Sequence, residues 1–137
     1  MKNIRIGVFE TNSSSSHSLT IESGVLQKST LPDQDGVIVG VLGKFGWEIE
    51  HYASHADKLS YLLTQIQYND HLTALAKSAI KEYTGLKMVV AGQGYIDHQS
   101  HDILNDLFSG SDEEIKQNMI KFVCNSGYSF DTDNDNH

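Results

Sequence analysis

The stretch Ile4–Ile21, IRIGVFETNSSSSHSLTI, joins two alternating apolar patterns through a block of polar residues. Apolar residues alternate with polar or small ones from Ile4 to Val8, and the alternation resumes at Leu19 and Ile21. A period of two is typical of a β-strand that buries one face. The stretch therefore predicts two neighbouring strands, with the serines in the turn or at the strand end between them.

Three further patterns extend the predicted sheet. The segment Gly24–Gly36 carries the only proline of the chain and several turn-forming residues, so it predicts a loop. Val37–Leu42 is continuously apolar and rich in β-branched residues, which is typical of a central strand. Lys87–Gly92 has a short apolar centre and predicts a short buried strand.

Apolar residues spaced three and four apart predict two helices, over residues 55–68 and 71–84. Ser54 stands where the first helix needs an N-terminal cap, and Asp70 stands in the same place for the second. Gly85 follows the last periodic residue and is expected to end the second helix.

The last third of the chain predicts two shorter helices and a hairpin. A helix is expected to start near Ser100, and the SDEE sequence of Ser111–Glu114 is a capping-box pattern for another. Apolar residues alternate over Ile120–Cys124 and again over Tyr128–Phe130, on either side of an NSG turn, which predicts a closing hairpin. The pattern as a whole predicts one α+β domain over residues 1–137, mainly antiparallel sheet with helices packed on it.

Composition excludes several classes of protein. The chain has 137 residues, 39% of them hydrophobic and 9% aromatic, which indicates a globular domain with a core rather than a disordered chain. No apolar run approaches the roughly 18 residues of a membrane span, and the N-terminus lacks the apolar run of a signal peptide. Cys124 is the one cysteine, so no internal disulfide can form, and we expect a packing role for it in a cytoplasmic protein.

The formal charge of −8 limits the partners. The ten Lys and Arg residues are scattered, so nothing offsets the repulsion of nucleic-acid phosphates or of anionic membrane surfaces. We therefore expect neither direct nucleic-acid binding nor membrane binding. An acidic surface can still dock onto a basic groove of another protein.

The block TNSSSSHS offers hydroxyls, an amide and an imidazole within eight residues, Thr11–Ser18. Hydroxyls and turn N–H groups can surround a phosphate or a carboxylate without any positive charge. A serine nucleophile with His17 as its base is a second alternative, although close neighbours on a strand usually point apart. The third is a plain polar turn whose hydroxyls cap its own backbone.

The segment GYIDHQS, Gly94–Ser100, has the pattern of a strand, a glycine-containing loop and a helix start, which can present N–H groups to an anion. Asp97 and His98 could form a carboxylate–imidazole unit. His101 lies three residues beyond His98, a spacing that metal sites accept on a helix. The alternative is that Ser100 merely caps a helix and His98 is polar surface.

Two other segments carry metal-ligand residue types. Glu48, His51 and His55 lie just before the first predicted helix, and Trp47 beside them suits a core or a pocket wall. The C-terminal DTDNDNH, Asp131–His137, resembles the front half of a calcium loop but lacks its glycine and its bidentate glutamate, which excludes an EF-hand. The tail could contribute to a composite divalent site, or it is an acidic terminus without a role.

Four short sequences, IRIGVFETNSSSSHSL, FGWE, GYIDHQS and a terminal NDN, resemble a group of small proteins of Gram-positive bacteria and their phages that share an N-terminal GVFETNSSSSHS motif. The resemblance carries with it no activity, catalytic residue or cofactor. It implies that the four segments meet around one site in a bacterial host cell, and that a phage-encoded inhibitor is a plausible role. The candidate catalytic residues are then His17, Asp97 and His98. The candidate ligand-binding residues are Thr11, Asn12, Ser13, Ser14, Ser15, Ser16, Trp47, Glu48, Ser100, Asp133 and Asn134.

Two functions therefore compete. In the first, the polar segments bind a phosphate-bearing small molecule such as a nucleotide, and could hydrolyse it with His17 or His98 as general base and aspartates that orient the base or hold a divalent metal. In the second, the protein is a phage-encoded, non-enzymatic inhibitor that binds a host defence protein through an acidic surface. We favour the first, because four loop-like segments rich in Ser, His, Asp and Asn exceed what a purely structural fold needs.

Overall fold

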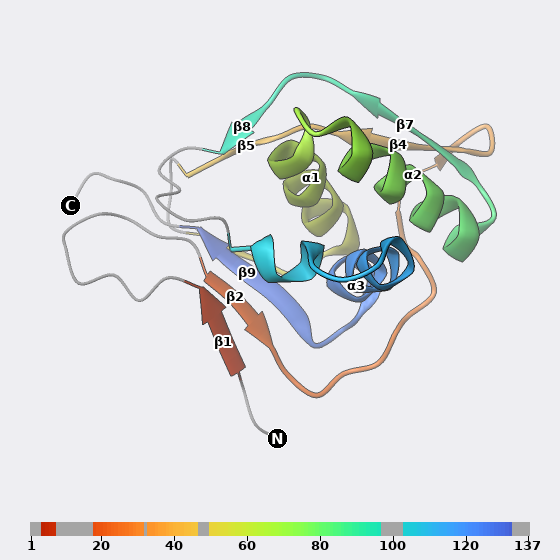
Figure 1. The fold of residues 1–137 in the computed structure, drawn as a ribbon. Helices are drawn as coiled ribbons and strands as arrows, with labels where there is room; N and C mark the ends of the chain where they lie inside the picture. Colours follow the sequence, from red (N-terminus) through yellow and green to blue (C-terminus); the bar gives the residue numbers. More distant parts are fainter. Residues whose placement is uncertain (1–3, 8–17, 32, 47–49, 97–102, 133–137) are drawn as a thin grey trace.

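The computed structural model describes residues 4–7, 18–31, 33–46, 50–96 and 103–132, and Figure 1 shows how they are arranged. Along the chain the elements are β1 (Ile4–Gly7), β2 (Ser18–Ile21), β3 (Asp33–Gln34), β4 (Val37–Val41), β5 (Lys44–Phe45), β6 (Glu50–Tyr52), α1 (His55–Ile66), α2 (Asp70–Thr84), β7 (Lys87–Ala91), β8 (Tyr95–Ile96), the 3₁₀ helix η1 (Asn105–Phe108), α3 (Asp112–Cys124) and β9 (Tyr128–Thr132).

The strands form an antiparallel sheet in the order β1-β2-β9-β6 and two smaller units. In the first small unit β4 lies between β3 and β7, antiparallel to β3 and parallel to β7. In the second, β5 pairs with β8 in parallel. The fold is therefore α+β with mostly antiparallel pairing, as predicted, and the expected β1–β2 and central β4 strands are confirmed.

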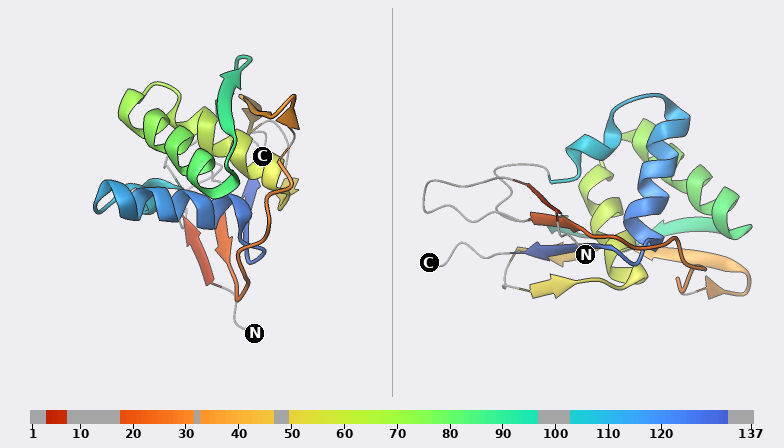
Figure 2. Two further views of the ribbon diagram at one scale, coloured as in Figure 1. Left: turned by 90° about the vertical axis from the view of Figure 1, so that its right-hand side faces the viewer. Right: turned by 90° about the horizontal axis from the view of Figure 1, so that it is seen from below.

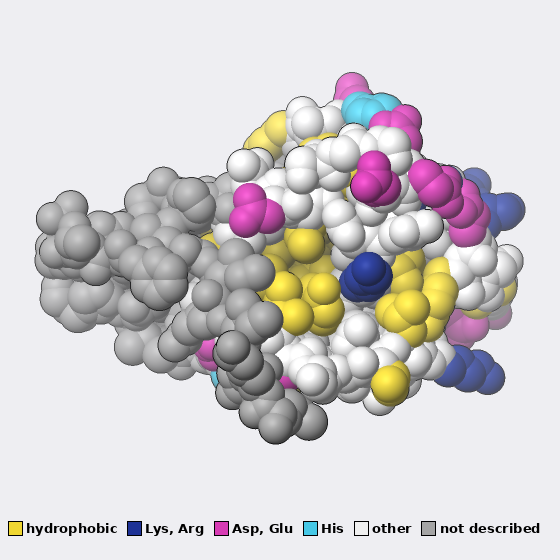
Figure 3. Space-filling model, turned by 60° about the horizontal axis from the view of Figure 1, so that its bottom comes forward, with side chains coloured by type: hydrophobic (Ala, Val, Ile, Leu, Met, Phe, Trp, Pro, Cys, Tyr) yellow, Lys and Arg dark blue, Asp and Glu magenta, His cyan; other side chains and the backbone are white. Residues whose placement is uncertain are grey.

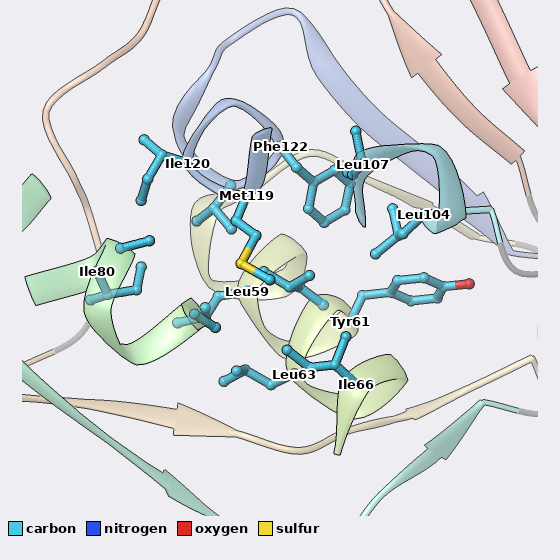
Figure 4. Close-up of a cluster of buried hydrophobic side chains, with 14 of the residues drawn as sticks. Leu59, Tyr61, Leu63, Ile66, Ile80, Leu104, Leu107, Met119, Ile120 and Phe122 are labelled. Carbon is cyan, nitrogen blue, oxygen red and sulfur yellow. The ribbon is translucent and has the colours of Figure 1, made fainter. Parts of the chain in front are cut away.

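Helix α1 lies at the centre of the fold. Figure 1 places β4 and β7 on one side of it and α3 on the other, and Figure 2 gives the same arrangement from two further directions. Leu59 and Ile66 of α1 are buried in the cluster of Figure 4, together with Met119 and Phe122 of α3. Strand β4 approaches α1 so closely that a Cβ atom at Gly40 would collide with the Leu63 side chain.

Local signals set the helix ends. The Ser54 hydroxyl accepts a hydrogen bond from the Asp57 N–H, and Ser111 with Glu114 forms a capping box at the start of α3. Asn69, rather than the expected Asp70, caps α2, because its side chain accepts from the Leu72 N–H. Gly85 ends α2 in the left-handed conformation, with φ of 80°. The two long helices are confirmed, with slightly different ends.

Three local predictions need correction. The expected hairpin does not form, because Ile120–Cys124 belongs to helix α3 and only β9 is a strand. The segment Gly24–Gly36 is not all loop, since it ends in β3 and a tight turn to β4. Strand β7 is not a buried strand but an edge strand whose residues alternate between buried and exposed. The helix expected near Ser100 would begin among residues 97–102, which lie outside the described residues, so its start stays a prediction. The next element that the structure describes is η1.

Phe130 joins the elements of the fold. It is fully buried on β9, and its ring contacts Tyr52 of β6 and Phe45 of β5 at centroid distances of 4.8 and 5.9 Å. It also contacts Tyr61 of α1 at 4.2 Å and Phe122 of α3 at 6.0 Å. Aromatic contacts of this kind add to the free energy of burial and fix ring orientation. One side chain thus links the antiparallel sheet, the β5–β8 unit and two helices.

We expect Phe130→Ala to lower the free energy of unfolding by about 3–5 kcal/mol, because it removes a fully buried ring and leaves a cavity that rigid neighbours cannot close. Urea unfolding followed by circular dichroism measures this change. Tyr68→Ala is the control, since Tyr68 is 92% exposed and its loss should change stability by less than about 0.5 kcal/mol. A loss below about 1 kcal/mol for Phe130→Ala would contradict the assigned role.

Candidate functional site

One row of paired residues crosses the antiparallel sheet at its end. Gly7 of β1 pairs with Ser18 of β2, Ser18 pairs with Asp131 of β9, and Asp131 pairs with His51 of β6. The next row contains Leu19, which pairs with the buried Phe130. Because successive residues of a strand point to opposite faces, Ser18, Asp131 and His51 share the outer face of the sheet.

This row and the next also mark where the chain enters or leaves three of the four segments that the sequence singled out. Residues 8–17 connect Gly7 to Ser18, and Asp133 directly follows the end of β9 at Thr132. Residues 47–49 directly precede Glu50, which pairs with Thr132. The attachment points of three segments therefore lie within one row or its immediate neighbour. We name this end of the sheet, made of Ser18, Glu50, His51, Asp131 and Thr132, the polar edge.

The fourth segment starts near the same end. Residues 97–102 directly follow Ile96, the last residue of β8, and Ile96 pairs with Phe45 of β5. The Phe45 ring contacts the ring of Tyr52 at 5.5 Å, edge to face, as well as that of Phe130. The β5–β8 unit therefore packs against β6 and β9 through the Phe45 ring, and the fourth segment follows Ile96, the residue that pairs with Phe45.

A carboxylate–imidazole pair lies on the polar edge. The Nδ1 atom of His51 is 2.8 Å from Oδ1 of Asp131, across the β6–β9 pairing. The His51 side chain is 60% exposed and that of Asp131 is 28% exposed, so solvent reaches the ring while the carboxylate is partly enclosed. A carboxylate that accepts from Nδ1–H leaves Nε2 as the basic nitrogen of a neutral ring. This is the orientation that general-base chemistry uses.

A second polar contact, between the Tyr52 hydroxyl and Glu50, lies on the opposite face of the β6–β9 strand pair. Burial raises the pKa of the Tyr52 hydroxyl to about 12, and a hydrogen bond to Glu50 acts in the same direction, while one to Thr132 opposes it. Glu50 and Tyr52 are two residues apart on β6 and so share a face, opposite to His51. Strand β6 therefore has a carboxylate contact on each of its two faces, His51 with Asp131 on one and Tyr52 with Glu50 on the other.

All the predicted site residues lie outside the described part of the chain. This holds for the proposed catalytic residues His17, Asp97 and His98. It also holds for the proposed ligand-binding residues Thr11, Asn12, Ser13, Ser14, Ser15, Ser16, Trp47, Glu48, Ser100, Asp133 and Asn134. Their roles stay predictions. What is described is where their segments attach, and those attachment points come together.

His51 and His55, which the sequence offered as metal ligands, have separate partners and do not form a common metal site. The Nδ1 atom of His55 accepts from the Thr30 N–H at 3.1 Å, and its Nε2 atom lies 3.2 Å from Oε1 of Gln27. His55 is buried, and burial lowers its pKa, followed by the charge of Lys58. Among the described residues no group of three His, Cys, Asp or Glu side chains could hold a metal ion.

The His51–Asp131 contact was not predicted, because the two residues are 80 positions apart and no local pattern says which strands pair. The sequence signal that could have indicated this contact is the alternation in β9, which puts Asp131 on the face opposite Phe130. The equivalent alternation in β6 puts His51 on the face opposite Tyr52. Only the register brings the two together.

A groove of about 390 Å³ lies between α2 and α3, away from the polar edge, and is lined by Leu26, Ala79, Tyr83 and Ile120 among others. Lys116 at its rim is bonded to Glu82 at 2.6 Å and to Glu113 at 3.2 Å. Helix α3 lies below α1 and α2 in Figure 1, and Figure 3 brings the lower side of the molecule forward to show hydrophobic patches on both sides of one basic side chain.

Two buried groups of the core that could take part in chemistry, the thiol of Cys124 and the amine of Lys58, have structural roles. Cys124 is fully buried, and burial raises its thiol pKa to about 11, so it stays protonated and is no nucleophile, as the sequence predicted. Lys58 is also fully buried, and its ammonium donates to the carbonyls of Asn125 and Tyr128 at 3.0 and 2.8 Å. Lys58 thereby holds the turn that leads from α3 into β9, the strand on which Phe130 and Asp131 lie.

Comparisons with known proteins add no assignment. The chain matches no family model, no curated protein and no solved structure. Within the described residues, no helix has the length and apolar character that crossing a membrane requires. The resemblance to the small phage and bacterial proteins therefore stays a prediction from the sequence.

We expect the free energy of unfolding to rise by roughly 1 kcal/mol between pH 8 and pH 9 because of Lys58. Burial lowers the pKa of Lys58 from 10.5 to about 8, so in this range the unfolded chain binds more protons than the folded one and stability increases with pH. From about pH 8 upward the buried Cys124 thiol acts in the opposite sense and offsets part of this increase, because its pKa is raised from 9.0 to about 11.

Urea unfolding at pH 7, 8, 8.5 and 9 measures the effect, and Lys58→Met is the control that should remove the increase. A neutral amine still has two N–H groups for the two carbonyls, so the wild-type fold should not change over this range. Stability that is constant or falls between pH 8 and pH 9 in the wild type would contradict this account.

Proposed function

We propose that the protein binds a phosphate-bearing small molecule, of the nucleotide class, at the polar edge, in the cytoplasm of a bacterial host cell. The observation that carries the proposal is the convergence of attachment points: Gly7, Ser18, Glu50 and Thr132 lie at one end of the antiparallel sheet, and Ile96 pairs with Phe45, whose ring contacts Tyr52 and Phe130. Of the segments that begin or end at these residues, 8–17, 97–102 and 133–137 are rich in Ser, Asn, His and Asp, and 47–49 contributes Trp47 and Glu48.

The chemistry of these segments suits a phosphate. Serine and threonine hydroxyls and backbone N–H groups donate directed hydrogen bonds, each worth roughly 1.5–3 kcal/mol when the acceptor is charged. Asp131 and Glu50 at the same edge repel a phosphate. We therefore expect binding to be strengthened by a divalent cation such as Mg²⁺, which carboxylates and phosphate oxygens can bind together.

A second candidate function, a phage-encoded inhibitor of a host defence protein that acts through an acidic surface, is favoured by one observation. Asp112, Glu113 and Glu114 gather in the first turn of α3, close to Glu82, and Figure 3 shows acidic side chains along one side of the molecule. Acidic residues at a helix start also favour the helix dipole, which accounts for them without a partner. This surface is separate from the polar edge, so variants can distinguish the two functions.

The test is the triple substitution of Ser14, Ser15 and His17 to alanine. Binding of AMP and of ATP, each with and without Mg²⁺, is measured by isothermal titration calorimetry. We expect the wild type to bind at least one of them and the triple variant to bind at least 100-fold more weakly, since two lost charge-assisted hydrogen bonds are worth about 3 kcal/mol or more. The melting temperature should change little.

The matched control is the triple substitution of Ser78, Ser109 and His71 to alanine, which removes the same residue types from α2 and from the segment before α3. It should bind the nucleotide as the wild type does. The proposal fails if no nucleotide binds to the wild type, or if both triple variants retain the same affinity. The inhibitor function would be favoured instead if substitution of Asp112 and Glu113 by Asn and Gln abolished binding of a host protein while the triple variant of Ser14, Ser15 and His17 retained it.

A further inference from the structure

We propose that His51, oriented by Asp131, is the general base of a phosphate monoester hydrolase at the polar edge. This inference rests on the proposed function, because it needs a phosphate-bearing ligand at that edge. It moves the basic role from His17 and His98, which the sequence suggested, to a histidine whose position and partner are described. The proposal uses only described residues: Ser18, His51 and Asp131 in one row of the sheet.

The geometry that supports the role is the contact between Nδ1 of His51 and Oδ1 of Asp131, at 2.8 Å. It favours the neutral tautomer with its proton on Nδ1 and its lone pair on Nε2, and it restricts rotation of the ring. The 60% exposed His51 ring is open to water, whereas the Asp131 carboxylate is 28% exposed and held on a paired strand. Glu50, the acid on β6, lies on the opposite face and does not compete for the ring.

The chain contains an internal comparison. His71 and Asp112 also form a pair, with Nε2 to Oδ1 at 3.0 Å, between α2 and α3. Both of these side chains are more than 60% exposed, and the pair lies beside none of the segment attachment points. A pair in which both partners are exposed holds its ring weakly. The His51–Asp131 pair therefore differs from the His71–Asp112 pair in two respects. Its carboxylate is partly enclosed, and it lies at the polar edge.

The reaction is balanced without a redox partner. A water oxygen attacks the phosphorus of a phosphate monoester, an O–P bond forms, and the bond between phosphorus and the alcohol oxygen breaks. Nε2 of His51 takes the proton of the attacking water and later releases it to solvent, and the alcohol oxygen that leaves on the opposite side of the phosphorus takes a proton from solvent. The products are inorganic phosphate and the alcohol. Asp131 contacts the His51 ring and is assigned no contact with the reacting atoms, so it is a positioning residue that stabilises the imidazolium formed in the step.

The experiment uses the full chain with AMP and Mg²⁺, and measures release of inorganic phosphate together with the Kd of AMP. We expect His51→Gln to lower turnover by at least 100-fold while the Kd changes less than about threefold, as is typical of the loss of a general base. His71→Gln is the matched control and should keep both values. A thermal melt of each variant verifies that it is folded.

Asp131→Asn tests the positioning role. It should lower turnover with little change in Kd, and the ¹⁵N NMR signals of the His51 ring should show a mixture of tautomers in place of the single Nδ1–H form. A purely structural role would leave the tautomer unchanged.

The outcomes separate the two proposals. If AMP binds to the wild type but no phosphate is released, or if His51→Gln keeps wild-type turnover, the general-base assignment is wrong and the binding function stands. If AMP does not bind to the wild type, both are wrong. A loss of turnover that is equal in His51→Gln and His71→Gln would also overturn the assignment.

Discussion

The contact of Phe130 with its aromatic neighbours is the constraint on which the rest of the structure depends. Its ring contacts those of Tyr52, Phe45, Tyr61 and Phe122, so one buried residue fixes β9 against β6, β5, α1 and α3. Because strands have a period of two, burial of Phe130 obliges the adjacent Asp131 to face outward. A slip of the register by one residue would bury the carboxylate and expose the ring. The hydrophobic core thus determines where the charged residue of the polar edge stands.

The same constraint makes the polar edge a meeting point. The pairing of Leu19 and Tyr52 with Phe130 places Ser18 and His51 one residue further along, on either side of Asp131. From that row the chain continues into the segment that contains the four serines Ser13–Ser16 and His17 and, past Thr132, into the Asp- and Asn-rich residues 133–137. Lys58 acts at the other end of β9, where its ammonium holds the carbonyls of Asn125 and Tyr128. Apolar packing and one buried hydrogen-bond donor therefore fix β9, and β9 positions the chemistry.

Local signals in the sequence predicted more than long-range ones. The helices α1 and α2, the cap at Ser54 and the capping box of Ser111 and Glu114 depend on residues within one turn of each other, and they were predicted correctly. The hairpin prediction failed because Ile120, Phe122 and Cys124 alternate, although the buried Ile115, Met119 and Val123 add the helical spacing that prevails. The parallel pairing of β4 with β7 and the contact of His51 with Asp131 depend on register across 50 to 80 residues, which no local pattern encodes. For the site, the sequence identified the polar segments but could not show that their ends share one row.

The central claim is that the polar segments and the His51–Asp131 pair form one ligand site. Titration of ¹⁵N-labelled protein with AMP and Mg²⁺, followed through its backbone amide and histidine ring signals, tests this claim most directly. The account predicts that signals of Ser14, Ser18, His51, His98 and Asp131 move together and saturate with one Kd, while those of Ala79 and Gln117 in the α2–α3 groove stay in place. Shifts confined to that groove, or shifts in a single polar segment with His51 unchanged, would contradict it.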